Sequence, residues 1–300
     1  MTISELATIE AWQSTPRARQ EELARDLAAR HGLTFELLAP FRRDDLPLAS
    51  YRGMDDLFRF VLVPGGTFDM GLSDAELAHL ASLAEPHRGE PTFDQAWGNL
   101  LVEPSPFRPV VRVTVEPCLF AQNTMGDFAL ADWRDEMGSA LVGENGDASS
   151  LPEDLEEALA AHGFRLPSEA EWEWCARGGR AGEITYKGNV VPDEKHFGRI
   201  SRELDRSEGP DEARHARIAN DFGLLGFGVH AELCRNRYAV PPDPAPAGPG
   251  GFADRVVRGG AGATYLWQNP GEWQAMLTAF RQRAGGLLNS VGVRPVRSLG

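Results

Sequence analysis

Residues 165–179, which read RLPSEAEWEWCARGG, decide the fold. Ser168 and Glu171 have the spacing of a capping box, in which each side chain hydrogen-bonds to the backbone amide of the other residue. Pro167 prevents the helix from beginning earlier, and the final Gly-Gly pair favours a left-handed end. The pattern therefore predicts one short helix with both of its ends marked.

The composition of this helix indicates that it lies inside the protein. Trp172, Cys175 and Ala176 share one face, at spacings of three and four residues, and the charged residues of the segment lie on other faces. Two tryptophans and a cysteine on so short a helix are typical of a core element. Taken alone, the segment predicts a structural role.

The bulk composition restricts the classes of partner. A chain of 300 residues can bury a sizeable core, and its 32 glycines and 21 prolines favour many turns between short elements. The formal net charge of −14 disfavours nucleic acids and anionic membranes, because phosphate binding needs a basic surface. We therefore expect the partner to be a protein or a small molecule.

Cysteine usage and the lack of long apolar runs favour a cytoplasmic protein. The chain has three widely spaced cysteines, which are Cys118, Cys175 and Cys234. An odd number at such spacing predicts neither a disulfide framework nor a metal-binding Cys-x-x-Cys knuckle. No segment approaches the roughly 18 apolar residues of a membrane-spanning helix, and the first residues do not resemble a signal peptide. We expect a reducing environment.

The rest of the chain predicts short helices and strands between long loops. Helical patterns occupy residues 4–31, 73–85, 126–137 and 150–163. Strand patterns occupy a hairpin at 58–70, which turns at 64–66, and the segments 110–115, 255–260 and 291–296. Loops are predicted at 86–106, 180–222 and 239–251. We expect a helical preface at residues 1–50 and one domain at residues 51–300, with an irregular α+β fold.

Four segments resemble, in the right order, motifs of the formylglycine-generating enzyme (sulfatase-modifying factor) family. They are residues 60–71 (FVLVPGGTFDMG), 165–179, 220–224 together with Glu232, and 255–260 together with 292–294. Several ordered motifs are more specific than any single one. The family fold is a variant of the C-type lectin fold, so the resemblance implies an α+β fold with short strands, few helices and long loops.

The resemblance also implies what this chain lacks. Members of the family oxidise a substrate cysteine with copper held by two cysteines near the C-terminus, and thiolates are soft ligands that suit Cu(I). The matching region, residues 261–283, contains no cysteine. Cys175 and Cys234 fall in structural motifs, at positions where the family shows other residues. We therefore expect no formylglycine-generating activity.

We expect no cofactor, with calcium as an open alternative. Calcium needs several oxygen ligands held together. The calcium segment of the family is degraded here, because residues 223–228 read GLLGFG, one residue shorter than the family pattern, although Glu232 is retained. A second alternative is a histidine–carboxylate metal site. Its candidate ligands are His230 and Glu232, with His196 and His215 in the same part of the chain.

The first functional hypothesis is a non-catalytic binding module that uses its C-terminal loop region. Residues 264–274 occupy the position of the family's active site and contain residue types that are favoured at recognition surfaces. The candidate ligand-binding residues are Tyr265, Trp267, Gln268, Asn269, Trp273, Arg281 and Arg283. The simpler interpretation is that the two tryptophans only fill space. In some relatives this region is hypervariable and binds diverse ligands.

Two other hypotheses stay open. One is a metal-dependent oxidase of the same superfamily, which would use non-haem iron or copper with altered chemistry and the histidines and arginines named above. The other is a subunit of a larger assembly, in which residues 1–50 and 73–106 are docking surfaces.

Overall fold

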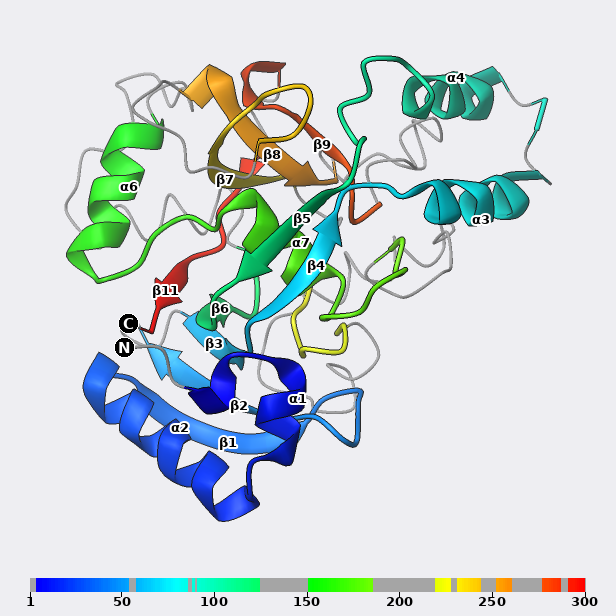
Figure 1. The fold of residues 1–300 in the computed structure, drawn as a ribbon. Helices are drawn as coiled ribbons and strands as arrows, with labels where there is room; N and C mark the ends of the chain where they lie inside the picture. Colours follow the sequence, from blue (N-terminus) through cyan, green and yellow to red (C-terminus); the bar gives the residue numbers. More distant parts are fainter. Residues whose placement is uncertain are drawn as a thin grey trace.

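The computed structural model describes residues 4–53, 58–85, 88–89, 91–124, 151–185, 219–227, 231–243, 252–260, 277–286 and 291–299. The fold mixes helices with mostly antiparallel sheets, as the sequence predicts (Figure 1). The helices are α1 (Ile9–Ser14), α2 (Arg17–His31), α3 (Asp74–Ala84), α4 (Pro91–Leu100), α6 (Leu151–Ala161) and α7 (Glu169–Ala176). The strands are β1 (Thr34–Pro40), β2 (Pro47–Gly53), β3 (Phe58–Val63), β4 (Gly66–Met70), β5 (Val111–Val115), β6 (Cys118–Ala121), β7 (Ala231–Arg237), β8 (Arg255–Gly259), β9 (Arg281–Arg283), β10 (Val291–Gly292) and β11 (Val296–Ser298).

The described strands form three sheets around α7. Their strand orders are β1-β2-β3-β6-β11, β10-β7-β8-β9 and β4-β5. The pairings are antiparallel except that of β10 with β7, which is parallel. Helix α7 contacts β4, β5, β7 and β8, and it lies at the centre of the molecule between the sheets (Figure 1). The helix that decides the fold in the sequence is therefore also its central element in space.

Helix α7 has the ends that its sequence predicts. The Glu171 amide donates to Ser168 Oγ over 3.1 Å, and the Ser168 amide donates to Glu171 Oε2 over 2.7 Å, which completes the capping box. Gly178 and Gly179 follow with φ angles of 61° and 71°, the left-handed conformation that glycine tolerates. All eight residues of the helix are buried, including its three glutamates.

The sequence predicts a hairpin at residues 58–70, but the two strands of this segment do not pair with each other. Strand β3 lies between β2 and β6, whereas β4 pairs with β5. The corner between β3 and β4 contacts Trp174, whose Nε1 donates to the carbonyl oxygen of Pro64 over 2.9 Å. At Gly66 a Cβ atom would lie 2.4 Å from the same indole. Because the corner is packed against this ring, the chain passes from one sheet to another instead of folding back.

Residues 4–31 are helical, as expected, but residues 34–53 form β1 and β2. These strands pair with each other, and β2 pairs with β3, so the boundary expected at residue 50 falls inside β2. Trp12 is buried, and its Nε1 donates to the carbonyl oxygen of Pro47 over 2.6 Å. Helix α2 packs against β1 and β2 (Figure 1). The first fifty residues therefore extend the largest sheet of the described structure.

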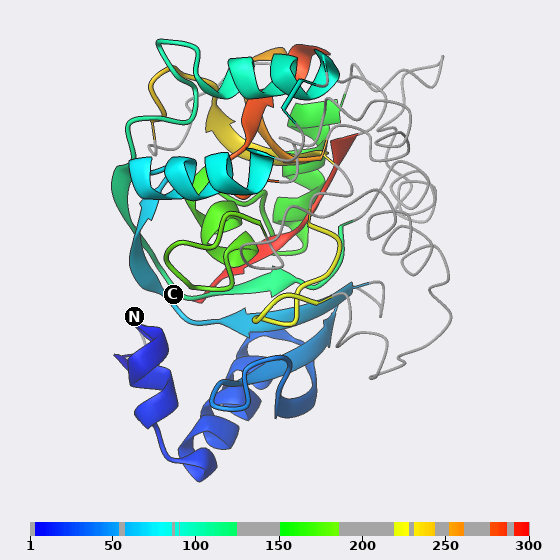
Figure 2. The same ribbon diagram turned by 90° about the vertical axis from the view of Figure 1, so that its right-hand side faces the viewer.

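Two other segments differ from the prediction. The loop predicted before residue 106 contains α4, which lies beside α3 (Figure 2) and contributes Trp97 and Leu100 to a small second core. The single strand predicted at 291–296 divides into β10 and β11, which pair in two different sheets. The helix predicted at 126–137 lies outside the described residues. No helix in the described part of the chain is long and apolar enough to cross a membrane.

Candidate functional site

Two buried glutamates of α7 pair with arginines from other elements. Glu169 binds Arg281 on β9, with a distance of 3.0 Å between Nη2 and Oε2. Glu173 binds Arg258 on β8, and it binds Arg177 with a distance of 2.8 Å between Nη2 and Oε1. Each of these side chains is at most 2% exposed. Because a buried charge is tolerated only with a partner, this network fixes β8 and β9 against α7.

The same arginines fix the chain on both sides of residues 261–276, the segment that contains most of the predicted ligand-binding residues. Arg258 lies just before this segment, and its Nη1 donates to the carbonyl oxygens of Ala279 (2.9 Å) and Phe280 (3.3 Å), which lie just after it. Arg281 begins the strand that follows. The residues on either side of the segment are therefore anchored to one helix and to each other.

The predicted ligand-binding residues fall into three groups. Arg281 is 2% exposed, and its guanidinium is bound by Glu169 and backbone carbonyls, so it belongs to the scaffold. Arg283 is exposed, 3.8 Å from the Asp254 carboxylate and 5.7 Å from the centre of the Tyr238 ring. The group that lies outside the described residues consists of Tyr265, Trp267, Gln268, Asn269 and Trp273.

Glu232, a predicted metal ligand on β7, is fully buried and bound by protein donors. Its Oε2 accepts from Trp172 Nε1 and Arg294 Nε, both at 2.8 Å. Its Oε1 accepts from Arg294 Nη2 at 2.7 Å and from the Thr124 hydroxyl. A metal ion would have to displace these donors. The histidines proposed beside it lie outside the described residues; they are His196, His215 and His230. Within the described residues, no three His, Cys, Asp or Glu side chains gather as a metal site requires.

The polar side chains of the family motif at residues 220–224, which leads into the degraded calcium segment, also bond to the protein itself. Asn220 donates from Nδ2 to the Cys175 carbonyl oxygen over 2.6 Å, and its Oδ1 accepts from the amides of Phe222 (3.0 Å) and Leu224 (3.1 Å). Asp221 pairs with Arg180 at 2.5 Å. These oxygens stabilise a turn beside α7, and calcium stays an open alternative to the expected absence of a cofactor.

The three cysteines are free and buried. Burial raises the pKa of the Cys175 thiol, and the neighbouring Cys118 thiol raises it further. Burial likewise raises the pKa of the Cys234 thiol. Because the thiolate is the nucleophile and the metal ligand, a buried thiol with a raised pKa is poorly suited to either role.

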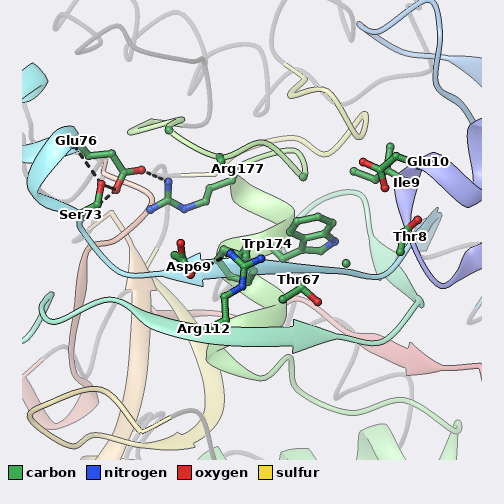
Figure 3. A pocket seen from close by; sticks show the side chains of 15 residues that line it. Thr8, Ile9, Glu10, Thr67, Asp69, Ser73, Glu76, Arg112, Trp174 and Arg177 are labelled. Carbon is green, nitrogen blue, oxygen red and sulfur yellow. Dashed lines mark hydrogen bonds and ion pairs between the residues drawn. The ribbon is translucent and has the colours of Figure 1, made fainter.

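A groove of about 450 Å³ opens beside β4 (Figure 3). Its walls are the beginning of α1, β4, the beginning of α3 and the turn after α7. At one end Arg177 and Glu76 point toward each other, with 2.5 Å between Nη1 and Oε1, and Glu10 lies at the other end (Figure 3). Trp174 lines the groove between them. Local sequence patterns do not reveal this groove, because the residues that line it come from separate segments, which also include Arg112 of β5.

The comparisons with known proteins place the chain in a family. A search of curated proteins finds no match. Among solved structures, Treponema denticola variable protein 1 matches with 15% sequence identity over 80% of this chain and 95% of that chain, at a TM-score of 0.41. The model of the sulfatase-modifying factor enzyme 1-like domain matches residues 108–299, nearly two thirds of the chain. This range includes α7 and every strand from β5 to β11. The chain therefore belongs to the sulfatase-modifying factor enzyme 1-like domain family.

Proposed function

We propose that this chain is a non-catalytic binding module, in which the family scaffold presents residues 261–276 to a protein or small-molecule ligand. The observation that carries the proposal is the pair of anchors at the ends of this segment. Arg258 and Arg281 bind Glu173 and Glu169 of the same buried helix. Recognition segments commonly vary on a rigid scaffold, and buried ion pairs at both ends supply that rigidity.

The residue types in the segment support recognition. Its candidate contact residues are Tyr265, Trp267, Gln268, Asn269 and Trp273. Tyrosine and tryptophan offer large contact areas at a small cost in side-chain entropy, and amides add adaptable hydrogen bonds. Arg283 is exposed on the strand that follows the segment, so it can add a positive charge beside the bound ligand. Arg281 serves this site as a positioning residue.

A binding experiment tests this role. The full chain is screened against arrayed glycans and a phage-displayed peptide library, and the ligands obtained are measured on a Trp267→Ala/Trp273→Ala variant. We expect the variant to lose at least about tenfold in affinity, as hot-spot aromatic residues do. The control is Leu37→Ala, which trims an exposed apolar side chain on β1. Equal binding by wild type and the tryptophan variant would place recognition elsewhere and contradict the proposal.

Metal analysis separates this function from the alternative oxidase. We expect inductively coupled plasma mass spectrometry to detect no stoichiometric iron or copper in the purified chain. Stoichiometric iron or copper that is lost in His230→Ala, together with oxygen uptake, would favour the oxidase. The His230 variant is the informative one, because Glu232 is the buried partner of Arg294 and its replacement would disturb the fold.

A further inference from the structure

Among the described strands, none pairs with one edge of β4, and the groove lies along that edge. Within the described residues, β4 pairs only with β5. Figure 3 shows most of the labelled lining side chains on the side of β4 that faces away from β5, while Arg112 reaches the groove from β5. A strand edge with unpaired amides and carbonyls is a template for another strand. The question is which backbone groups of β4 face the groove.

The hydrogen bonds at the two ends of β4 answer this question. The Gly65 amide donates to the Leu6 carbonyl oxygen over 2.9 Å, and the Gly71 amide donates to Glu173 Oε1 over 2.8 Å, so both point away from β5. The Leu72 amide donates to the Phe107 carbonyl oxygen over 2.9 Å, on the side of β5. In an antiparallel ladder, alternate residues direct both backbone groups to the same side. The odd-numbered positions of β4 therefore face the groove.

Those positions are Thr67 and Asp69, and both line the groove. Their backbone N–H and C=O groups lie between the two ends of the β4 edge, where Leu6 and Glu173 already accept hydrogen bonds from the backbone. The four or five residues of such a strand span roughly 16 Å, enough for a short extended peptide. The groove volume of about 450 Å³ lies within the range of about 300–1,000 Å³ that ligand pockets have.

The turn after α7 forms another wall of the groove and leaves room for a strand. It contains Gly179, Ala181 and Gly182, of which Ala181 and Gly182 are exposed. A Cβ atom at Gly182 would meet no atom within 4 Å. Trp174 is held in place by its hydrogen bond to Pro64 and offers an apolar surface to side chains on one face of the added strand.

The charges in the groove favour a basic partner. Asp69 pairs with Arg112 at 3.1 Å, and Glu76 pairs with Arg177 at 2.5 Å, so these four charges balance. Glu10 is exposed at the end of the groove and makes no ion pair with a described residue. The formal net charge of −14 attracts the same kind of partner at a distance.

We propose that an extended peptide segment carrying a lysine or arginine binds in this groove as a third strand beside β4. Its backbone exchanges hydrogen bonds with Thr67 and Asp69, and its basic side chain pairs with Glu10. Backbone hydrogen bonds supply affinity in this mode of recognition, and the flanking side chains supply specificity. This proposal does not depend on the function proposed for residues 261–276.

The test uses the full chain and a phage-displayed library of random heptapeptides. We expect the enriched peptides to contain lysine or arginine. Ala181→Trp fills the groove and should weaken their binding at least about tenfold, whereas Ala160→Trp, at an exposed position on α6, should leave it unchanged. Glu10→Lys should reverse the preference from basic to acidic peptides, since like charges then meet at the end of the groove.

Synthetic peptides test the strand pairing itself. N-methylation of alternate amides in one register should cost about tenfold in affinity, whereas methylation in the other register should cost little, because only one set of amides faces β4. The proposal is overturned if no peptide is enriched, if Ala181→Trp binds as well as wild type, or if neither register is sensitive to methylation.

Two further outcomes would assign the peptides or the groove elsewhere. In the first outcome, the peptides no longer bind Trp267→Ala/Trp273→Ala but bind Ala181→Trp fully. The peptides would then bind residues 261–276, which supports the function proposed for that segment and overturns the proposal of a third strand beside β4. A wild-type dimer that becomes a monomer in Ala181→Trp would make a second copy of the chain the occupant, and it too overturns the peptide proposal.

Discussion

Arg294 and Glu232 form a doubly hydrogen-bonded ion pair that is closed to solvent, with 2.8 Å between Nε and Oε2 and 2.7 Å between Nη2 and Oε1. The other N–H groups of Arg294 donate to the carbonyl oxygens of Ala121, Gln122 and Leu225. Arg294 lies between β10 and β11, at the point where the chain crosses from one sheet to another. The pair therefore joins the two larger sheets.

Removing the charge of Glu232 should be strongly destabilising. We expect Glu232→Gln to lower the free energy of unfolding by about 3–5 kcal/mol, because Arg294 keeps a buried charge without its partner. Urea unfolding followed by circular dichroism measures this loss. The control is Asp69→Asn, which breaks the exposed pair with Arg112 and should cost less than about 1 kcal/mol. Equal small losses in both variants would contradict the role given to the buried pair.

Two glycine substitutions should change stability in opposite directions. Gly66→Ala places a Cβ atom 2.4 Å from the Trp174 ring, which its hydrogen bond to Pro64 prevents from moving freely, so we expect a loss of about 1–3 kcal/mol. Gly98 lies inside α4 with no atom within 4 Å of an added Cβ, so Gly98→Ala should gain up to about 1 kcal/mol. Thermal unfolding of the two variants side by side measures both signs, and a stabilising Gly66→Ala would refute the packing argument.

The protein should lose stability as the pH falls below neutrality, in part through His31. Burial lowers the pKa of His31, and the charges of Arg297 and Arg30 lower it further. The unfolded chain therefore binds a proton more readily than the folded one. The stabilisation is complete above the ordinary histidine pKa of about 6.5 and decreases as the pH falls toward the lowered folded value.

Urea midpoints of wild type and His31→Gln at pH 8 and pH 5 isolate this contribution from other titrating groups. We expect the wild type to lose more between the two pH values than the variant does. Parallel behaviour of the two proteins would show that His31 titrates alike in both states.

The three thiols should be unreactive in the folded protein. Cys118, Cys175 and Cys234 are each at most 1% exposed, and burial raises the pKa of Cys175 and Cys234. We therefore expect Ellman's reagent to detect no rapidly reacting thiol in the native chain and all three thiols in guanidinium chloride. A thiol that reacts quickly in the native chain would contradict the buried placement of that cysteine.

The sequence predicted α7 well because its signals are local. Ser168, Glu171 and the two glycines lie within a dozen residues of each other, and each acts on the backbone next to it. The pairing of strands depends on residues that are distant in the sequence. The turn at Pro64 predicts a hairpin, but Trp174, which lies far along the chain, packs into this corner and separates the two strands. Likewise α4 contributes Trp97 and Leu100 to a second core that also contains Phe280, which lies far along the chain.

The candidate site was predictable only in part, for the same reason. Glu173 is separated by 85 residues from Arg258, and Glu169 by 112 residues from Arg281. No local pattern reveals that these charges are buried together, so Arg281 looked like a ligand-binding residue. Glu232 resembled a metal ligand because this one residue of the family's calcium segment is retained, whereas its bond to Arg294 becomes visible only in three dimensions.

The fixed positions of the residues on either side of 261–276 bear on how far the length of this segment can change. Its neighbours on both sides are fixed to α7 through Arg258 and Arg281, and those contacts involve no residue of the segment itself. The entropic cost of joining two fixed points of a chain rises only slowly with the length of the connection. A connection of another length between β8 and β9 would therefore leave the ion pairs of this framework in place.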